Sequence, residues 1–393
     1  MPLVDMRDML LHAYRNGYAI GAFDLVSLDF LEGILQAAEQ QRSPVILSLA
    51  ESHFDHYNFS YLMAATVAAA RSAKVPVAIH LDHGSQIESV VRAIHLGCNG
   101  VMLDASHLPY EENIRVTREV VKLAHSCGVP VEGELGYVAG VEGEDARQHP
   151  GNLIYTSPEQ AQQFVAETQV DFLAVSIGTV HGRLKGTPRL DIPRLQAIYQ
   201  QVDRPLVIHG GTGLSEAQYR QLIDHGVAKI NYFTALSDAA ANQIWENRHR
   251  LQPRSYTDWL QGVREAIQKE VESKMQLWGS SGKAETVLTH CKRWQEVEHV
   301  VLFNVDASTD EAQVRAMMRR GRPLLTAIPG VRRVFTGKSL TPEGRFLYCW
   351  IIRFAHPEVI TYYRDHPDHQ QFADTAFRPI AGDRLTLDFE ELD

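Results

Sequence analysis

Short apolar runs alternate with segments of helical period along most of the chain. The runs that read as buried strands are Tyr18–Phe23, Val45–Leu49, Val77–His83, Gly100–Asp104, Val129–Gly136, Phe172–Gly178, Leu206–Gly211 and Ala228–Thr234. Amphipathic stretches lie between them, among them Leu28–Gln41, Ile87–Leu96, Glu111–His125, Pro158–Thr168 and Ser215–His225. Strands that alternate with helices in this way predict an α/β fold, a (β/α)8 TIM barrel. A doubly wound sheet is the alternative, but Gly21-Ala22-Phe23-Asp24 is not its Gly-rich fingerprint.

Two segments depart from short connections. Tyr137–Ser157 is polar and rich in glycine, and its length is typical of a lid over a site. Ala235–Met275 reads as a long helical tail interrupted at Pro253, and the Gly/Ser-rich break Trp278–Lys283 marks a boundary. We therefore expect a barrel domain over residues 1–284 and a linker over 285–296.

The pattern changes in the last hundred residues or so. Strands are expected at Val297–Asn304, Val331–Thr336, Phe346–Phe354 and Arg384–Phe389, and helices at Asp310–Leu325 and His356–His366. This β-α-β-β-α-β order predicts a small ferredoxin-like α+β domain over residues 297–393.

Composition narrows the function class. Of the 393 residues, 45% are hydrophobic and 22% charged, which is ordinary for a soluble globular protein. The net charge of -10, with no long basic run, argues against a nucleic-acid partner. Four scattered cysteines, the lack of a signal-peptide core and the lack of a membrane-spanning run predict a cytoplasmic protein with reduced thiols and no membrane partner.

Polar, titratable side chains recur where the barrel strands end. They are Asp82 and His83, Asp104, Glu132 and Glu134, His181, and His209. Three imidazoles converging above a barrel, with an open fourth position, describe a catalytic zinc or similar divalent site. Asp104 and Glu134 add oxygen ligands for an alternate or second metal position.

Glycines cluster after the same strands, in Gly178–Gly182 and His209–Gly213. Their backbone N–H groups, with the Thr212 hydroxyl, could cradle a phosphate, and Lys185 could add a positive charge. Tight turns that need positive φ explain the glycines equally well. Both readings stay open.

These stretches carry a family resemblance. The matching segments are His80-Leu81-Asp82-His83-Gly84, Met102–His107, Glu111-Glu112-Asn113, Glu132–Gly136, Ala174–Gly182, His209–Gly213 and Lys229-Ile230-Asn231. Residues 1–284 resemble the class II, metal-dependent ketose-bisphosphate aldolases, including the fructose- and tagatose-bisphosphate enzymes.

The resemblance implies a role for each matching residue. His83, His181 and His209 would hold a catalytic Zn2+, and Asp104 and Glu134 would serve a second divalent or monovalent cation. Asp82 would be the proton donor on the aldehyde side and Glu142 the mobile acid/base of the long loop. Dihydroxyacetone phosphate would be held by Gly182, Gly210, Gly211, Thr212, Asn231 and Thr234.

The implied activity is reversible cleavage of a ketose (bis)phosphate to dihydroxyacetone phosphate and an aldehyde through a zinc-stabilised enediolate. Some departures bear on the substrate. Asp24 stands where the family often has Asn, and Leu260 stands where bisphosphate enzymes carry an Arg for the distal phosphate. Tyr232 and Phe233 are bulky and could reshape the phosphate pocket. A related aldolase for a non-bisphosphate or unphosphorylated polyol is therefore an alternative, and a non-catalytic ligand-binding barrel is another.

The C-terminal domain resembles the stress-responsive dimeric α/β-barrel domain. The matching features are Val297–Phe303, Ile328–Val331 and Tyr362–His369. Such a sheet has one uncovered face, so we expect a dimerisation module and a homodimer or homotetramer. His299, His366 and His369 could instead line a small-molecule pocket or a second active site.

Overall fold

The computed structural model describes residues 2–138, 154–183, 188–250, 255–341 and 343–392. The chain divides into two compact units, one with residues 1–90, 98–121 and 130–293 and the other with residues 91–97, 122–129 and 294–393. Among the described residues, no helix combines the length and the apolar character needed to cross a bilayer.

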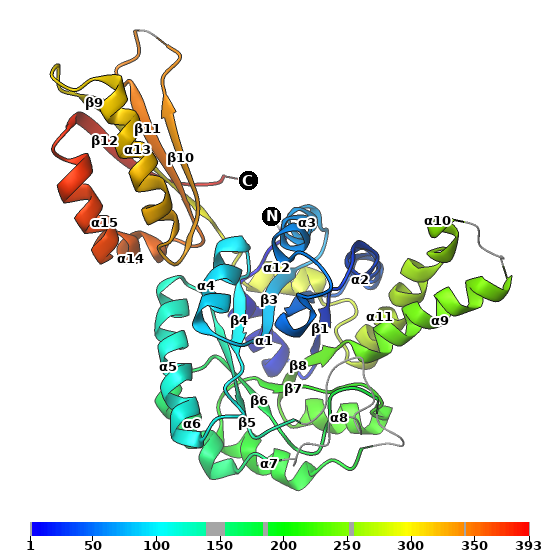
Figure 1. Ribbon diagram of the computed structural model, residues 1–393. Helices are drawn as coiled ribbons and strands as arrows, with labels where there is room; N and C mark the ends of the chain where they lie inside the picture. Colours follow the sequence, from blue (N-terminus) through cyan, green and yellow to red (C-terminus); the bar gives the residue numbers. More distant parts are fainter. Residues whose placement is uncertain (1, 139–153, 184–187, 251–254, 342, 393) are drawn as a thin grey trace. The chain divides into compact units, whose positions relative to one another are not determined.

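The first unit is built on a closed parallel barrel (Figure 1). Its strands are β1 Ile20–Asp24, β2 Val45–Ala50, β3 Val77–Gly84, β4 Gly100–Leu103, β5 Val131–Leu135, β6 Phe172–Val175, β7 Leu206–Ile208 and β8 Val227–Tyr232. They pair in chain order, and β1 closes the ring by pairing with β8 in parallel. The predicted TIM barrel is confirmed.

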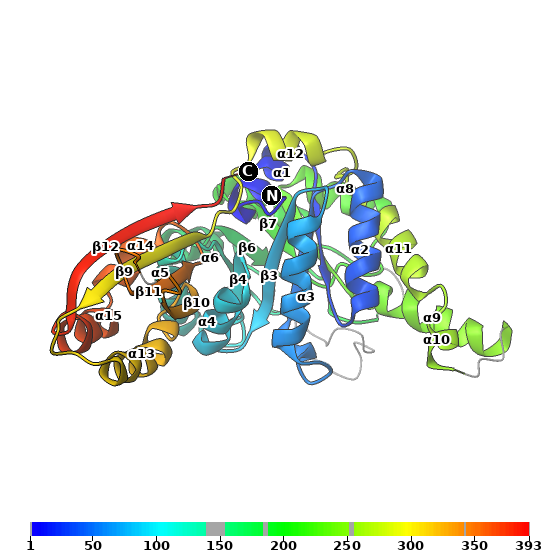
Figure 2. The ribbon, with the colours of Figure 1, turned by 90° about the horizontal axis from the view of Figure 1, so that it is seen from above.

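Helices surround the barrel. They are α2 Leu28–Gln41, α3 Phe59–Ser72, α4 Ile87–Leu96, α5 Tyr110–Ser126, α6 Pro158–Thr168, α7 Ile192–Gln201, α8 Glu216–Asp224, α9 Thr234–Arg250, α10 Tyr256–Trp259, α11 Val263–Leu277 and α12 Ala284–His290, with a short 3-10 turn at Glu51–His53. In Figure 2, α3, α2 and α11 run side by side along the outside of the barrel. The sequence anticipated the break after α9, but α12 lies in the stretch expected to be a linker.

Helix α1 (Met6–Arg15) closes the amino end of the barrel. Asp5 caps it by accepting hydrogen bonds from the backbone N–H groups of Arg7 and Asp8. Its buried face joins one hydrophobic cluster with the apolar interior residues of the strands. Helix α1 was not among the helices predicted from the sequence. This end of the barrel is therefore sealed mainly by apolar contacts.

The second unit is a four-stranded antiparallel sheet with helices. Its elements are β9 Val297–Val305, α13 Glu311–Thr326, β10 Val331–Lys338, β11 Tyr348–Phe354, α14 Val359–Asp365, α15 Pro367–Phe372, a π-helical turn Ala373–Phe377 and β12 Ala381–Glu390. The strand order is β10-β11-β9-β12, and each neighbouring pair is antiparallel. The predicted β-α-β-β-α-β order is confirmed.

The two faces of this sheet differ. Gly321 of α13 lies so close to Phe372 and Trp350 that a Cβ would approach their rings to 2.4 and 2.7 Å, so the helices pack tightly on one face. The other face carries apolar side chains that stay open. Phe335, Leu385, Leu387 and Phe389 expose 39 to 50% of their surface.

Candidate active site

Strand β3 turns sharply at His83. This residue has φ +46°, in the left-handed region, and the pairing of β3 with β4 shifts between Leu81 and Gly84. Left-handed backbone costs a non-glycine residue about 1–2 kcal/mol. Arg42 and Gln169 adopt it as helix C-caps. His83 adopts it at a strand end among titratable side chains, which is typical of functional sites.

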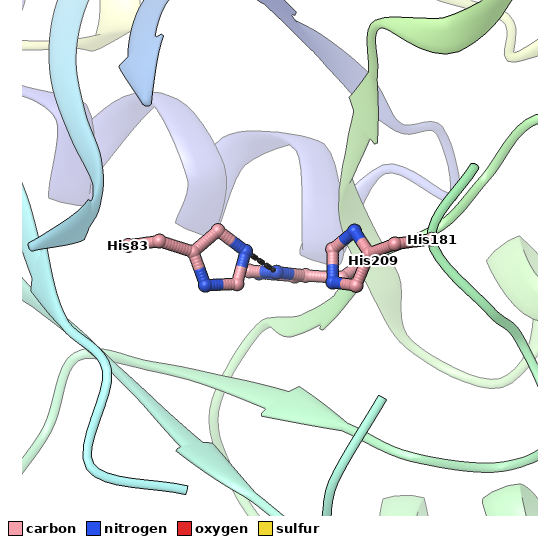
Figure 3. A group of neighbouring side chains, drawn as sticks. All are labelled: His83, His181 and His209. Carbon is pink, nitrogen blue, oxygen red and sulfur yellow. Dashed lines mark hydrogen bonds between the residues drawn. The ribbon is translucent and has the colours of Figure 1, made fainter. Parts of the chain in front are cut away.

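Three imidazoles converge at the carboxyl end of the barrel. Figure 3 shows the rings of His83, His181 and His209 turned towards one another. His83 Nε2 lies 2.8 Å from His209 Nδ1, and the His181 ring centroid lies 5.1 and 5.9 Å from the centroids of His83 and His209. One nitrogen of each ring lies within 4.8 Å of the others. The structure therefore brings together the three residues expected to bind metal.

The donor set fits a zinc ion. Zinc bound tetrahedrally by imidazoles at 2.0–2.1 Å holds two of the nitrogens about 3.3 Å apart. The separations between the three nitrogens bracket that value, from 2.8 Å to at most 4.8 Å. Small side-chain movements would bring the rings to zinc distances and leave a fourth position for a reactant.

Carboxylates fix the orientation of two of the rings. His83 Nδ1 lies 2.9 Å from Asp104 Oδ2, and His209 Nε2 lies 2.8 Å from Glu132 Oε1. An ionised carboxylate can only accept, so each of these nitrogens carries the proton and the other nitrogen of the ring is free to bind metal. Burial opposes the charge on Asp104, but the hydrogen bond from His83 outweighs it and lowers the pKa of this carboxyl.

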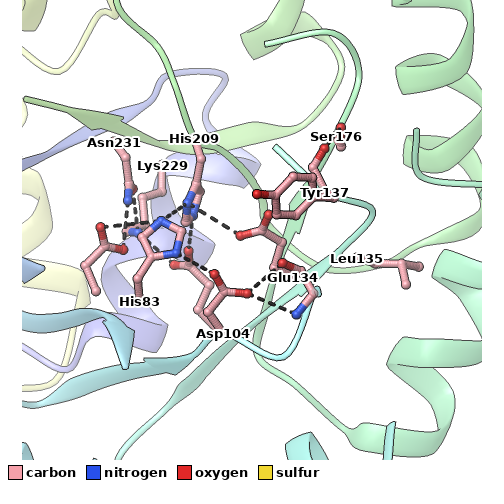
Figure 4. A network of polar contacts seen from close by, with 12 residues as sticks. His83, Asp104, Glu134, Leu135, Tyr137, Ser176, His209, Lys229 and Asn231 are labelled. Carbon is pink, nitrogen blue, oxygen red and sulfur yellow. Dashed lines mark hydrogen bonds and ion pairs between the residues drawn. The ribbon is translucent and has the colours of Figure 1, made fainter. Parts of the chain in front are cut away.

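A second group of ligands adjoins the first. His83, Asp104 and Glu134 also bring one donor atom each within 4.8 Å. Glu134 Oε2 lies 3.6 Å from His209 Nδ1. Burial and the neighbouring Asp104 carboxylate raise the pKa of Glu134 well above its ordinary value. The structure places both expected oxygen ligands, Asp104 and Glu134, beside His83 and His209 (Figure 4).

Asp82 is fully buried beside the imidazoles. Its Oδ1 accepts a hydrogen bond of 2.9 Å from Asn231 Nδ2, and its Oδ2 lies 3.9 Å from His83 Nε2 without a hydrogen-bond partner among the described residues. Burial would raise the pKa of Asp82, but His83, His209 and Lys229 outweigh it and lower the pKa. One oxygen is thus held by the protein while the other faces the histidines.

The expected phosphate residues lie on the loops after β6, β7 and β8. Gly182 directly follows His181, and Thr234 is the first residue of α9. Gly210 has φ +64°, and a Cβ there would lie 2.2 Å from the Val180 carbonyl oxygen. This turn therefore requires glycine for its own geometry. Gly211 is packed similarly, with a Cβ position 2.8 Å from Ile230 Cγ2. Thr212 follows in the same loop.

Two expected site residues, Glu142 and Lys185, lie outside the described residues, as does most of the long loop Tyr137–Ser157. Tyr232, one of the bulky residues expected to reshape the phosphate pocket, packs towards α11 instead. Its hydroxyl donates to Glu270 Oε1 at 2.7 Å, and its ring makes an edge contact with Trp278.

The sequence did not assign roles to the polar residues below the histidines. Glu132 and Lys229 are fully buried and form an ion pair of 2.8 Å, and Ser48 and His80 lie in the same region. A signal was available, because Lys229 and Glu132 precede Asn231 and Glu134 by two residues. In a strand, residues i and i+2 point to the same face, so each pair shares the barrel interior.

The histidines of the second unit have separate surroundings. His299 and His369 line a cavity with Tyr363 and Trp350, while His366 caps α15. The cavity holds about 50 Å³. This volume is below the roughly 150 Å³ of a cavity that is known to admit benzene.

A parallel barrel that gathers imidazoles and carboxylates at its carboxyl end has the architecture of a metal-dependent barrel enzyme. Residues 4–283 match the family model of the class-II fructose-bisphosphate aldolases, and residues 297–391 match the stress responsive A/B barrel domain. The chain belongs to the class-II fructose-bisphosphate aldolase family, whose members are lyases, and carries an added A/B barrel domain.

Individual aldolases are also similar to this chain. The chain is 43% identical over 291 residues to the probable fructose-bisphosphate aldolase of Bacillus subtilis (strain 168), and the match covers 72% of this chain and all of the relative. It is 39% identical, with the same coverage, to the fructose-bisphosphate aldolase of Staphylococcus epidermidis. The crystal structure of the YdjI aldolase from Escherichia coli K12 superposes with a TM-score of 0.65 at 37% identity, over 72% of this chain and 99% of that one.

Proposed function

We propose that the barrel is a zinc-dependent aldolase that reversibly cleaves a ketose phosphate or bisphosphate to dihydroxyacetone phosphate and an aldehyde. The observation that carries the proposal is the convergence of His83, His181 and His209 next to the free Oδ2 of Asp82. These groups can bind a Lewis acid and move a proton at one place. Bound there, zinc would stabilise negative charge that develops on substrate oxygens.

The protein's own residues divide the remaining work. In the cleavage direction, the ionised Asp82 takes the proton of the hydroxyl at the bond that breaks, through Oδ2. In the synthetic direction, it returns that proton to the aldehyde oxygen. Glu142 is proposed as the acid/base on the ketone side. Asp104 and Glu132 keep His83 and His209 oriented, and Asp104 and Glu134 offer a position for a second divalent or monovalent cation.

The phosphate is proposed to lie against the loops after β6, β7 and β8. Backbone N–H groups of Gly182, Gly210 and Gly211 and the hydroxyls of Thr212 and Thr234 are the expected donors, with Lys185 as counter-charge. The amino end of α9, at Thr234, adds the positive end of a helix dipole. Late loops and helix termini of this kind are where TIM barrels bind phosphate.

A second candidate is an aldolase whose substrate has no distal phosphate. Asp24 ends β1 at the carboxyl end of the barrel and is fully buried. Leu260 stands where the bisphosphate enzymes carry an Arg, and it offers no charge to bind a second phosphate. Leu260 therefore favours a substrate without a distal phosphate.

The C-terminal unit is proposed to assemble two chains. The open face of its sheet carries the partly exposed apolar side chains Val300, Phe335, Ile351, Leu387 and Phe389, together with the charged Glu298 and Arg333. An identical face on a second chain would cover it, which is the isologous interface of a homodimer. A homotetramer would need a further contact elsewhere.

The test is a substrate panel with and without a chelator. The purified protein should contain zinc, lose activity to a strong chelator and regain it with added zinc, whereas borohydride should trap nothing. Absence of zinc together with no gain on its addition would refute the enzyme assignment. Equal turnover of ketose bisphosphates and monophosphates would support the second candidate over a bisphosphate substrate.

A further inference from the structure

A continuous line of buried polar contacts joins a zinc-ligand candidate to the proton-transfer residue, and Lys229 lies in its middle (Figure 4). His209 Nε2 contacts Glu132 Oε1 at 2.8 Å, and Glu132 Oε2 contacts Lys229 Nζ at 2.8 Å. Lys229 Nζ donates to Asn231 Oδ1 at 2.7 Å, and Asn231 Nδ2 donates to Asp82 Oδ1 at 2.9 Å.

The line is isolated from solvent. Glu132, Lys229, His209 and Asp82 are fully buried, and Asn231 is 1% exposed. Lysine and glutamate are almost never fully buried unless they are paired, and a buried charge without a partner is strongly destabilising. The ammonium and the Glu132 carboxylate therefore hold each other in the core. Burial alone would raise the pKa of Glu132, but Lys229 and His209 lower it to about 2.

The chemistry of Lys229 dictates how the Asn231 amide points. An ammonium only donates, so the amide oxygen must face Lys229. The amide NH2 group then faces Asp82, where an ionised carboxylate accepts from it. With an apolar residue at position 229, the Asn231 amide would be oriented from the Asp82 side alone, and its oxygen would lose the donor that holds it in place.

Glu132 is ordered in the same way. Its Oε2 lies against Lys229, which leaves Oε1 to accept the Nε2 proton of His209. With that proton fixed, His209 presents the Nδ1 lone pair on the side of His83 and His181. One ammonium thus acts on two branches, one ending at Asp82 and one at His209.

We propose that Lys229 is the positioning residue of this site: it fixes the Asn231 amide and the Glu132 carboxylate, so that Asp82 presents Oδ2 and His209 presents Nδ1 to the reactants. The part of the inference that concerns Asp82 rests on the proposed aldolase function. The part that concerns His209 depends only on the residues of this chain and the metal ion that they would hold. Lys229 touches neither substrate nor metal in this scheme.

The experiment compares Lys229→Met, Glu132→Gln, the double variant and the control Lys274→Met with the wild type. Methionine keeps the length of the side chain and removes the charge. Lys274 is also paired, 3.2 Å from Glu270, and lies over the Tyr232 ring, away from the line of contacts. The readouts are thermal unfolding, kcat and KM for cleavage, and retention of zinc against a competing chelator.

We expect Lys229→Met to lower kcat about 100-fold with KM within about threefold, and to weaken zinc retention about tenfold, the range seen when groups that orient metal ligands are removed. The double variant should recover much of the thermal stability, because no buried charge is left without its partner. It should not recover kcat, because the Asn231 oxygen still lacks the donor that holds the amide in place. Lys274→Met should keep kcat and zinc retention.

A purely structural role predicts a different pattern. If the double variant regains kcat together with stability, or if folded Lys229→Met keeps kcat and zinc retention, the inference is overturned. If the wild type cleaves no ketose phosphate, the proposed function fails and zinc retention decides the inference alone. A tenfold loss in Lys229→Met then supports it, and unchanged retention refutes it.

Discussion

Charged residues are usually exposed and apolar residues buried, but the barrel and the C-terminal sheet each depart from this rule. The barrel buries charges, and the sheet exposes apolar side chains. The barrel buries Asp82, Glu132 and Lys229 completely, whereas the sheet exposes half of Phe389 and about two fifths of Leu387. The buried charges have partners within the chain, at 2.7 to 2.9 Å. The apolar residues on the open face of the sheet stay exposed among the residues that the structure describes. Buried charged residues are typical of a functional site, and an exposed apolar face is typical of a surface that binds another molecule.

Single substitutions should also affect the two regions differently. Removing one member of a buried charged network leaves another unpaired, so one substitution disturbs several groups. Apolar contacts across an interface contribute more nearly independently, so losing one of them weakens assembly without altering the residues of the active site. Substitutions ranked by effect can test this contrast.

The largest effect is expected for His209→Ala. It removes a ligand nitrogen and leaves Glu132 without the imidazole that it orients. Zinc content should fall below one tenth of the wild type, and turnover should fall by at least about 1,000-fold, because the Lewis acid is lost with the ligand. Metal analysis and a cleavage assay measure both. His225→Ala, at the partly exposed residue that caps the carboxyl end of α8, is the matched control and should change neither.

Asp82→Ala should separate proton transfer from metal binding. The three imidazoles remain, so zinc content should stay near that of the wild type. Loss of a general acid/base should lower kcat about 100- to 10,000-fold. An Asp82→Ala protein with wild-type turnover would remove this residue from the mechanism. A protein that has lost its zinc as well would show that Asp82 also supports the ligands.

The sequence predicted the barrel from the periodicity of its apolar residues and the three imidazoles from their residue type and position. Apolar runs alternating with helices define the barrel, and histidines at strand ends stand out against an apolar background. The sequence also predicted which residues would cluster at the carboxyl end, since parallel strands deliver their ends to one place.

What it could not predict depends on side-chain geometry. Nothing in the run Val227–Tyr232 says that Lys229 meets Glu132 across the barrel, because that contact depends on strand register. The left-handed turn at His83 has no signature either, because the following Gly84 is where positive φ would be expected. The Tyr232 side chain shows the same limit, since only the structure reveals that it faces α11.

A pH dependence should distinguish the buried ion pair from surface pairs. The pKa of Glu132 is lowered in the folded state to about 2. Its ionised form therefore stabilises the fold above the unfolded-state pKa, and this contribution disappears as the pH falls from about 4.5 towards 2. Between pH 5 and pH 3 the double variant Glu132→Gln, Lys229→Met should lose about 2 kcal/mol less unfolding free energy than the wild type.

Urea unfolding of the zinc-free proteins at pH 5, 4 and 3 provides this measurement. Glu112→Gln is the control, because Glu112 pairs with Arg115 on the exposed surface of α5. Its pH dependence should match that of the wild type, since exposed pairs contribute little. Parallel pH curves for the double variant and the wild type would contradict the stabilising role of the Glu132 charge.

The smallest effect on catalysis, and the clearest on assembly, is expected for Leu387→Asp. Leu387 pairs with Val300 across β12 and β9 and lies on the open face, whereas Thr386, one residue earlier, points to the opposite face. A charge at position 387 must be desolvated if a second sheet covers this face, which disfavours the dimer. Light scattering should shift from dimer towards monomer, while kcat stays within about twofold because the barrel residues are untouched. Thr386→Asp is the control and should leave the dimer intact. If both variants dissociate, the substitutions unfold the sheet. If neither dissociates, the interface lies elsewhere.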